Sequence, residues 1–118
     1  MIYGPWKLFV DDVRDLTWVY PDANPDEWVV CRSVLEAATA ISRLGWPSFV
    51  SFDHDLGLDV PTGYDLAKIL IELDLDTPSN EDGMPKDFGF AVHSANPVGR
   101  ANIEAMLTRY LVYRDSNG

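Results

Sequence analysis

Acidic, imidazole and hydroxyl side chains follow three short apolar runs of this 118-residue chain. They are Asp11 and Asp12 after the first run, Asp53, His54 and Asp55 after the second, and His93 and Ser94 after the third. Carboxylates that come together repel one another unless a cation lies between them, and Mg²⁺ prefers oxygen ligands. Capping a turn or ending a strand is the alternative role for each acid. We interpret Asp11, Asp12, Asp53 and Asp55 as candidate ligands for Mg²⁺ or Mn²⁺.

The two histidines of the chain, His54 and His93, both stand next to these strand-end groups. An imidazole near its ordinary pKa can transfer protons at neutral pH. Together with Asp53, they are the candidate catalytic residues. Strand alternation places Asp53 and Asp55 on one side and His54 on the other, so the assignment of His54 is the weaker one. For either histidine the alternative is a structural hydrogen bond to a backbone carbonyl beneath a loop.

Polar residues at expected helix starts are candidate phosphate ligands. A helix N-terminus offers free N–H groups and the positive end of the helix dipole, which together favour an anion. The candidates are Ser94 and Asn96 just before the last helix, Arg100 in its first turn, and Thr62 at the start of another helix. Asn96 and Thr62 are also expected N-caps, and capping is their alternative role.

Strands and helices alternate along the sequence. Apolar, β-branched runs predict strands at 6–10, 27–32, 48–52 and 88–93. Ser33, Thr62 and Asn96 precede stripes of apolar residues at helical spacing, which predicts three helices. Residues 74–86 are expected to form a loop or flap, and 115–118 a frayed tail.

This alternation predicts an α/β fold, a three-layer parallel sheet with helices on both faces. Right-handed crossovers bring the carboxyl ends of all strands to one edge, so the candidate residues should meet there. The length and the absence of a linker predict a single domain over residues 1–118.

Composition limits the classes of function. The net charge of −10 disfavours an extended nucleic-acid surface, but it leaves room for a small phosphorylated ligand. One cysteine, Cys31, rules out a disulfide framework, and no apolar run reaches membrane-spanning length. We expect a cytoplasmic protein without membrane contact. Its oligomeric state does not follow from the sequence.

The sequence resembles response-regulator receiver domains at Asp11-Asp12, Asp53 and Ser94, which match the acidic pair, the phosphoacceptor and the hydroxyl residue of that family. The fifth strand of a receiver and its lysine have no counterpart. The chain is more similar to the cyclic-phosphate-processing receiver domains, with matching segments at 8–14, 51–57, 62–66 and 93–103. This resemblance implies a four-stranded sheet in the order 2-1-3-4. It also implies action on cyclic phosphates, in RNA repair or phage–host conflict.

Two hypotheses follow. The first is a metal-dependent phosphoesterase that acts on an RNA 2′,3′-cyclic end or a cyclic nucleotide. The second is a non-catalytic, receiver-like module that binds a protein partner or a nucleotide through the same acids.

Overall fold

The computed structural model describes residues 5–77 and 83–117. Its four parallel strands are β1 (Lys7–Val10), β2 (Trp28–Cys31), β3 (Phe49–Phe52) and β4 (Gly89–Val92). They form one sheet in the order β2-β1-β3-β4, which confirms the predicted order. Because the strands are parallel and in register, Val10 lies beside both Cys31 and Phe52, and Phe52 lies beside Val92. All four carboxyl ends therefore share one edge of the sheet.

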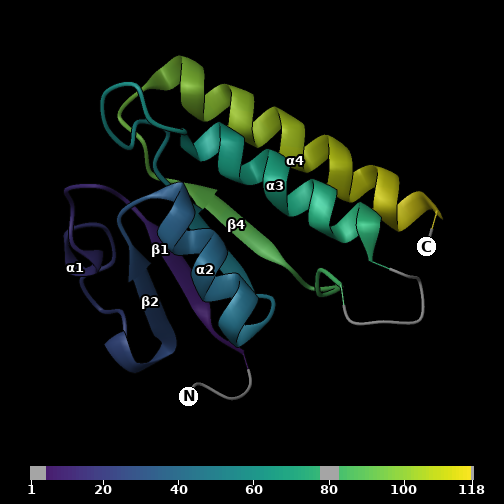
Figure 1. Cartoon of the computed structure of the whole chain (residues 1–118), viewed down its shortest axis with the longest axis horizontal. Coiled ribbons are helices and arrows are strands. Elements are labelled where there is room, and N and C mark those ends of the chain that lie inside the picture. Colours follow the sequence, from purple (N-terminus) through teal and green to yellow (C-terminus); the bar gives the residue numbers. More distant parts are fainter. Residues whose placement is uncertain (1–4, 78–82, 118) are drawn as a thin grey trace.

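The three long helices are α2 (Val34–Leu44), α3 (Gly63–Asp76) and α4 (Pro97–Asn117). They lie side by side, and their buried residues form one apolar cluster with those of the strands (Figure 1). The direction of the crossovers explains this arrangement. The connections β2–β3 and β3–β4 run the same way across the sheet, so right-handed crossovers put α2 and α3 on the same face. The β1–β2 connection runs the opposite way and covers the second face.

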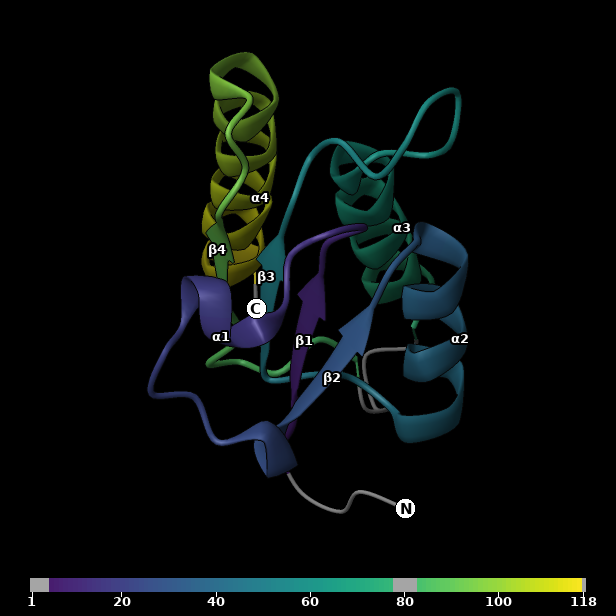
Figure 2. The same ribbon diagram turned by 90° about the vertical axis from the view of Figure 1, so that its left-hand side faces the viewer.

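The second face of the sheet is covered by a short segment. It contains only the four-residue helix α1 (Leu16–Val19) and the 3₁₀ turn η1 (Pro25–Glu27), as Figure 2 shows. Aromatic rings fill this layer: Phe9 of β1 packs edge-to-face against Tyr20 and Trp28 and stacks on His93. Helices lie on both faces of the sheet, as predicted, but the three long ones share one face and only the short α1 lies on the other.

The helix starts follow the sequence closely. The side chains of Ser33 and Thr62 accept from the backbone N–H groups three residues on, and Asn96 accepts from Gly99 N–H at 2.9 Å. Thr62 and Asp65 form the complete capping box.

Two helix ends differ from the prediction. The helix α3 continues through Asp76 and α4 through Asn117, so 74–76 is not loop and 115–117 is not frayed. Tertiary contacts hold both ends: Tyr110 of α4 donates to Asp74 of α3, and Arg114 of α4 donates to the carbonyls of Met84 and Pro85 in the segment before β4. These contacts join residues far apart in the sequence, so the spacing of apolar residues could not predict them. Residues 78–82, in the middle of the expected flap, lie outside the described residues.

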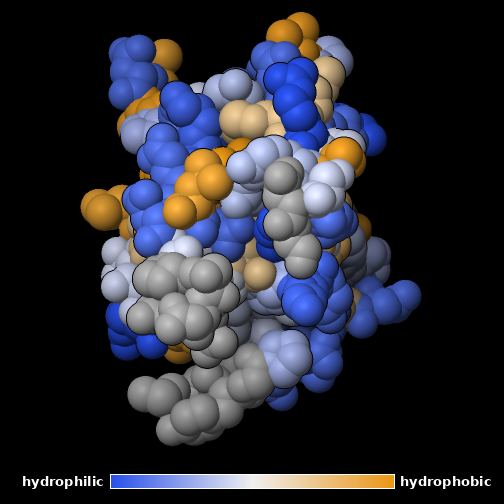
Figure 3. All heavy atoms as spheres, turned by 90° about the vertical axis from the view of Figure 1, so that its right-hand side faces the viewer, coloured by the Kyte–Doolittle hydropathy of each residue, from blue (hydrophilic) through white to orange (hydrophobic). Residues whose placement is uncertain are grey.

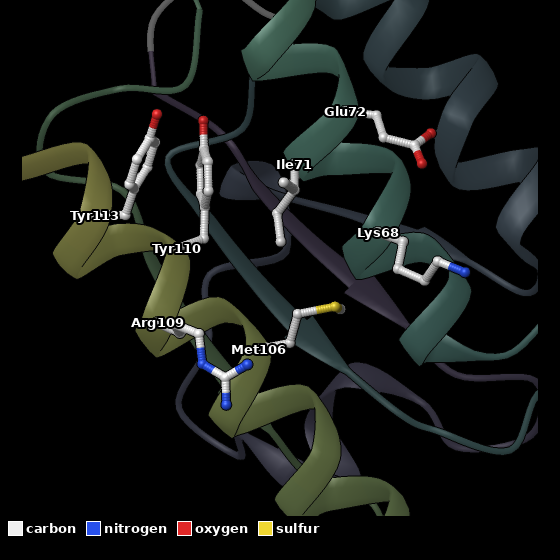
Figure 4. A pocket seen from close by; sticks show the side chains of 7 residues that line it. All are labelled: Lys68, Ile71, Glu72, Met106, Arg109, Tyr110 and Tyr113. Atoms are coloured by element: carbon white, nitrogen blue, oxygen red, sulfur yellow. The ribbon is translucent and has the colours of Figure 1, made fainter. Parts of the chain in front are cut away.

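The surface offers a groove between α3 and α4, of about 410 Å³. Ile71, Met106 and Tyr110 are among its lining residues, and Lys68 and Arg109 stand at its sides (Figure 4). None of the residues that line it belongs to the strand-end group of acids. Over the face shown in Figure 3, hydrophilic side chains predominate and apolar ones form separate groups. Within 5–77 and 83–117, no helix has the length and apolar character to span a membrane.

Candidate metal centre

Three carboxylates meet where β1 and β3 end. Asp11 and Asp12 follow β1, Asp53 follows β3, and one oxygen from each lies within 4.8 Å of the other two. Asp11 and Asp53 are buried, and Asp12 is half-buried. The predicted convergence of these three side chains is confirmed, and they are called the acid cluster below.

The carboxylate of Asp11 is held on both of its oxygens. Its Oδ1 accepts from the backbone N–H groups of Val13, at 2.9 Å, and Arg14, at 2.7 Å. Its Oδ2 contacts His93 Nε2 at 3.0 Å, and the guanidinium of Arg14 lies 3.8 Å away. With only 1% of the residue exposed, these contacts replace water around the charge.

Asp53 is less well compensated. Burial raises the pKa of its carboxyl above the ordinary value, and the nearby charge of Asp11 raises it further. A hydrogen bond from Ser94 and the positive charge of Arg14 act in the opposite direction without cancelling the effect. Within the described part of the chain Asp53 forms no ion pair, and a cation in the acid cluster would supply a positive partner.

The donor set fits a hard divalent cation. Mg²⁺ and Mn²⁺ take oxygen ligands, and Mg²⁺ keeps several positions for water and for substrate phosphate. The acid cluster offers three carboxylates from adjacent strand ends, two of them buried. These three residues could therefore hold the predicted cation.

The fourth acid predicted as a ligand, Asp55, is not part of the acid cluster. Its exposed carboxylate contacts His54 Nδ1 at 2.8 Å and accepts from the Asn96 amide at 3.3 Å. The hydrogen bond with His54 lowers the pKa of Asp55. His54 in turn lies against the first turn of α4, where a Cβ on Gly99 would come within 2.3 Å of its ring. This group joins β3 to α4 beside the acid cluster.

His93 contacts the acid cluster through Asp11, and its side chain is only 5% exposed. Both ring nitrogens have protein partners, Nε2 with Asp11 and Nδ1 with Ser51 Oγ at 2.7 Å. The ring stacks on Phe9 with 4.6 Å between centroids. Burial lowers the pKa of His93 despite its hydrogen bond to Asp11. A proton on this ring faces Asp11, and the geometry favours a positioning role over direct proton transfer to a ligand.

The candidate phosphate ligands divide into two groups. Ser94 is buried beside Asp53, and its Oγ also accepts from Asn96 N–H at 3.1 Å, so both residues stand next to the acid cluster. Arg100 is exposed and forms an ion pair with Glu104 at 3.4 Å. Thr62 is occupied as the N-cap of α3.

Four residues linked to the acid cluster by hydrogen bonds, directly or through His93, were not among the predicted site residues: Arg14, Arg32, Ser51 and Tyr20. The guanidinium of Arg14 donates to the His93 carbonyl at 2.9 Å and lies 3.8 Å from the Asp11 carboxylate. Arg32 donates to the carbonyls of Asp11 and Arg14 and so fixes the loop after β1. One feature of the sequence could have identified Arg14 as a site residue, namely its position two residues after the acidic pair.

The fold and the acid cluster define a receiver-like α/β domain with a carboxylate site at the carboxyl edge of its sheet. The sequence pattern of a family described as the cyclic-phosphate processing receiver domain matches residues 6–109. The chain belongs to this family. The match includes all four strands, the acid cluster and the first half of α4. Neither the curated proteins nor the solved structures gave a significant match.

Proposed function

We propose that this domain is a metal-dependent phosphoesterase that opens a cyclic phosphate, either an RNA 2′,3′-cyclic end or a cyclic nucleotide. The observation that carries the proposal is the acid cluster, with three carboxylate oxygens within 4.8 Å at the edge where an open parallel sheet binds its ligands. The description of the family supplies the substrate class.

In this proposal Asp11, Asp12 and Asp53 hold Mg²⁺ or Mn²⁺. A cation held there would supply positive charge near the phosphoryl oxygens and make the attacking water more acidic. Ser94, Asn96 and the guanidinium of Arg14 lie close enough to the acid cluster to orient the phosphoryl group. Hydrolysis adds water to phosphorus, breaks one ring P–O bond and gives the departing ribose oxygen a proton. His93 is enclosed, so we assign that proton to water.

The test is turnover of 2′,3′-cyclic AMP by the full chain with Mn²⁺, followed as formation of the phosphomonoester by anion-exchange chromatography of samples stopped with EDTA. Asp12→Asn and Asp53→Asn each remove one charge from the acid cluster and should lower turnover at least about a hundredfold. Asp22→Asn makes the same change at an exposed residue of the β1–β2 connection and should retain activity. Equal turnover by all three variants would overturn the proposal.

A second candidate is a non-catalytic module that binds a nucleotide or a protein partner through the same edge. The histidine positions favour it, because His93 is enclosed and His54 is engaged with Asp55 and the first turn of α4. The same assay separates the two functions. Cation-dependent binding of the cyclic nucleotide, with the ligand recovered unchanged, would support the module.

A further inference from the structure

A chain of hydrogen bonds leads from the acid cluster, at the edge of the sheet, along the second face to Tyr20. Asp11 Oδ2 contacts His93 Nε2 at 3.0 Å, His93 Nδ1 contacts Ser51 Oγ at 2.7 Å, and Ser51 Oγ contacts the hydroxyl of Tyr20 at 2.9 Å. Ser51 is completely buried in β3, and Tyr20 belongs to the segment that covers the second face. The four residues come from four separate parts of the sequence.

The donor and acceptor of each hydrogen bond between Asp11, His93, Ser51 and Tyr20 can be assigned. A carboxylate only accepts, so the proton of neutral His93 lies on Nε2 and Nδ1 must accept. Ser51 then donates its single proton to Nδ1, and the Tyr20 hydroxyl donates to Ser51 Oγ. The order applies to the neutral ring, in which only one of the two nitrogens carries a proton. The Tyr20 hydroxyl therefore orients the hydroxyl proton of Ser51, and Ser51 in turn favours the proton of His93 on Nε2.

Packing prevents these rings from turning. His93 stacks on Phe9 with 4° between the ring planes. Tyr20 stacks on Trp28 with 5.3 Å between centroids, and its edge packs on Phe9 at 6.3 Å. The ring orientations that the hydrogen bonds need are thus the ones that the aromatic layer enforces.

The hydrogen bonds among residues 5–77 and 83–117 leave one acceptor site of the Asp11 carboxylate open. A carboxylate has about four acceptor sites. Val13 N–H and Arg14 N–H occupy two on Oδ1, and His93 occupies one on Oδ2. The remaining site is on Oδ2, and its direction depends on where His93 holds that oxygen.

We propose that Tyr20, Ser51 and His93 are positioning residues that aim the free lone pair of Asp11 Oδ2 into the acid cluster and thereby set its affinity for a divalent cation. The inference rests on the proposed metal site. It assigns a role in cation binding to Tyr20, which lies on the second face of the sheet. Hydrogen-bond partners of this kind typically change metal affinity about 10- to 100-fold when they are removed.

The experiment measures Mn²⁺ affinity of the full chain by electron paramagnetic resonance of the free ion. Tyr20→Phe keeps the stacked ring and removes only the hydroxyl, and it should weaken binding about tenfold. Ser51→Ala should weaken it by a similar factor. Tyr110→Phe is the matched control, because it also removes one hydrogen-bonded hydroxyl, the one bound to Asp74 between α3 and α4. Its Mn²⁺ affinity should equal that of the wild type.

A second readout needs no metal. In EDTA, at a pH where His93 is neutral, the imidazole ¹⁵N spectrum should show its proton on Nε2; Ser51→Ala should keep the proton there, because Asp11 still accepts it, and should shift only the Nδ1 resonance, which loses its donor. A wild type that binds no Mn²⁺ would overturn the proposed function together with this inference. A wild type that binds, with Tyr20→Phe indistinguishable from Tyr110→Phe, would overturn the positioning role alone. A proton found on Nδ1 would overturn it as well.

Discussion

Removing the charge of Asp53 should stabilise the fold when no metal is present. Two unit charges 4.8 Å apart repel by about 3.5 kcal/mol at an effective dielectric constant of 20. Arg14, 3.8 Å from Asp11, and the hydrogen bond from Ser94 to Asp53 offset part of this repulsion. We expect Asp53→Asn to raise the free energy of unfolding by about 1 kcal/mol, which corresponds to about 4 °C in melting temperature for a chain of this size.

The assay is thermal unfolding followed by circular dichroism at pH 7, in EDTA and in excess Mn²⁺. In EDTA, Asp53→Asn should melt at a higher temperature than the wild type. The exposed control Asp22→Asn should melt at the same temperature as the wild type. In excess Mn²⁺ the order should reverse, because a cation that binds only the folded wild type stabilises it by about 2.7 kcal/mol at a hundred times its Kd. A variant that melts below the wild type in EDTA would refute the argument from charge repulsion.

The pH dependence gives an independent check in EDTA. Burial raises the pKa of Asp53 in the folded chain above its ordinary value of 3.8, so the folded state binds protons more readily than the unfolded state. The charged form therefore costs stability fully at pH values above the folded pKa, and the cost disappears as the pH falls toward 3.8. The melting temperatures of wild type and Asp53→Asn should converge on acidification. A constant difference between them across this range would contradict the assigned cause.

Three further outcomes are expected. Gly63→Ala should destabilise the chain by about 3 kcal/mol or more in denaturant unfolding, because its Cβ would lie 2.0 Å from the backbone oxygen of Asp53. Gly45→Ala would meet open space, so its cost should be that of the strained backbone alone, about 1–3 kcal/mol at φ 87° and ψ −169°. Cys31 should react with iodoacetamide at pH 8 at least about 100-fold more slowly in the folded than in the unfolded chain, since burial raises its pKa from 9.0 to about 11. Tyr110→Phe should lower stability by about 1 kcal/mol, measured in urea, through loss of its hydrogen bond to Asp74.

Local signals in the sequence were enough to predict the framework of the site. Apolar runs predicted the four strands, and the side chains of Ser33, Thr62 and Asn96 predicted the helix starts, because capping is a contact between residues three apart. The order of the strands followed from the family resemblance, and the handedness of parallel crossovers then placed every strand end at one edge. The meeting of Asp11, Asp12 and Asp53 needed no more than this.

Tertiary structure decided what each side chain does at that edge. Strand alternation does not extend past the end of β3, so it could not show that Asp55 turns toward His54 and Asn96 and away from the acid cluster. The enclosure of His93 depends on Phe9 and Ser51, which lie at least 42 residues away in the sequence. Contacts between residues so far apart produce no periodic pattern in the sequence, because they form only when the chain has folded into the sheet and its second layer. The sequence determined which chemical groups reach the edge, and packing alone determined which of them face a ligand.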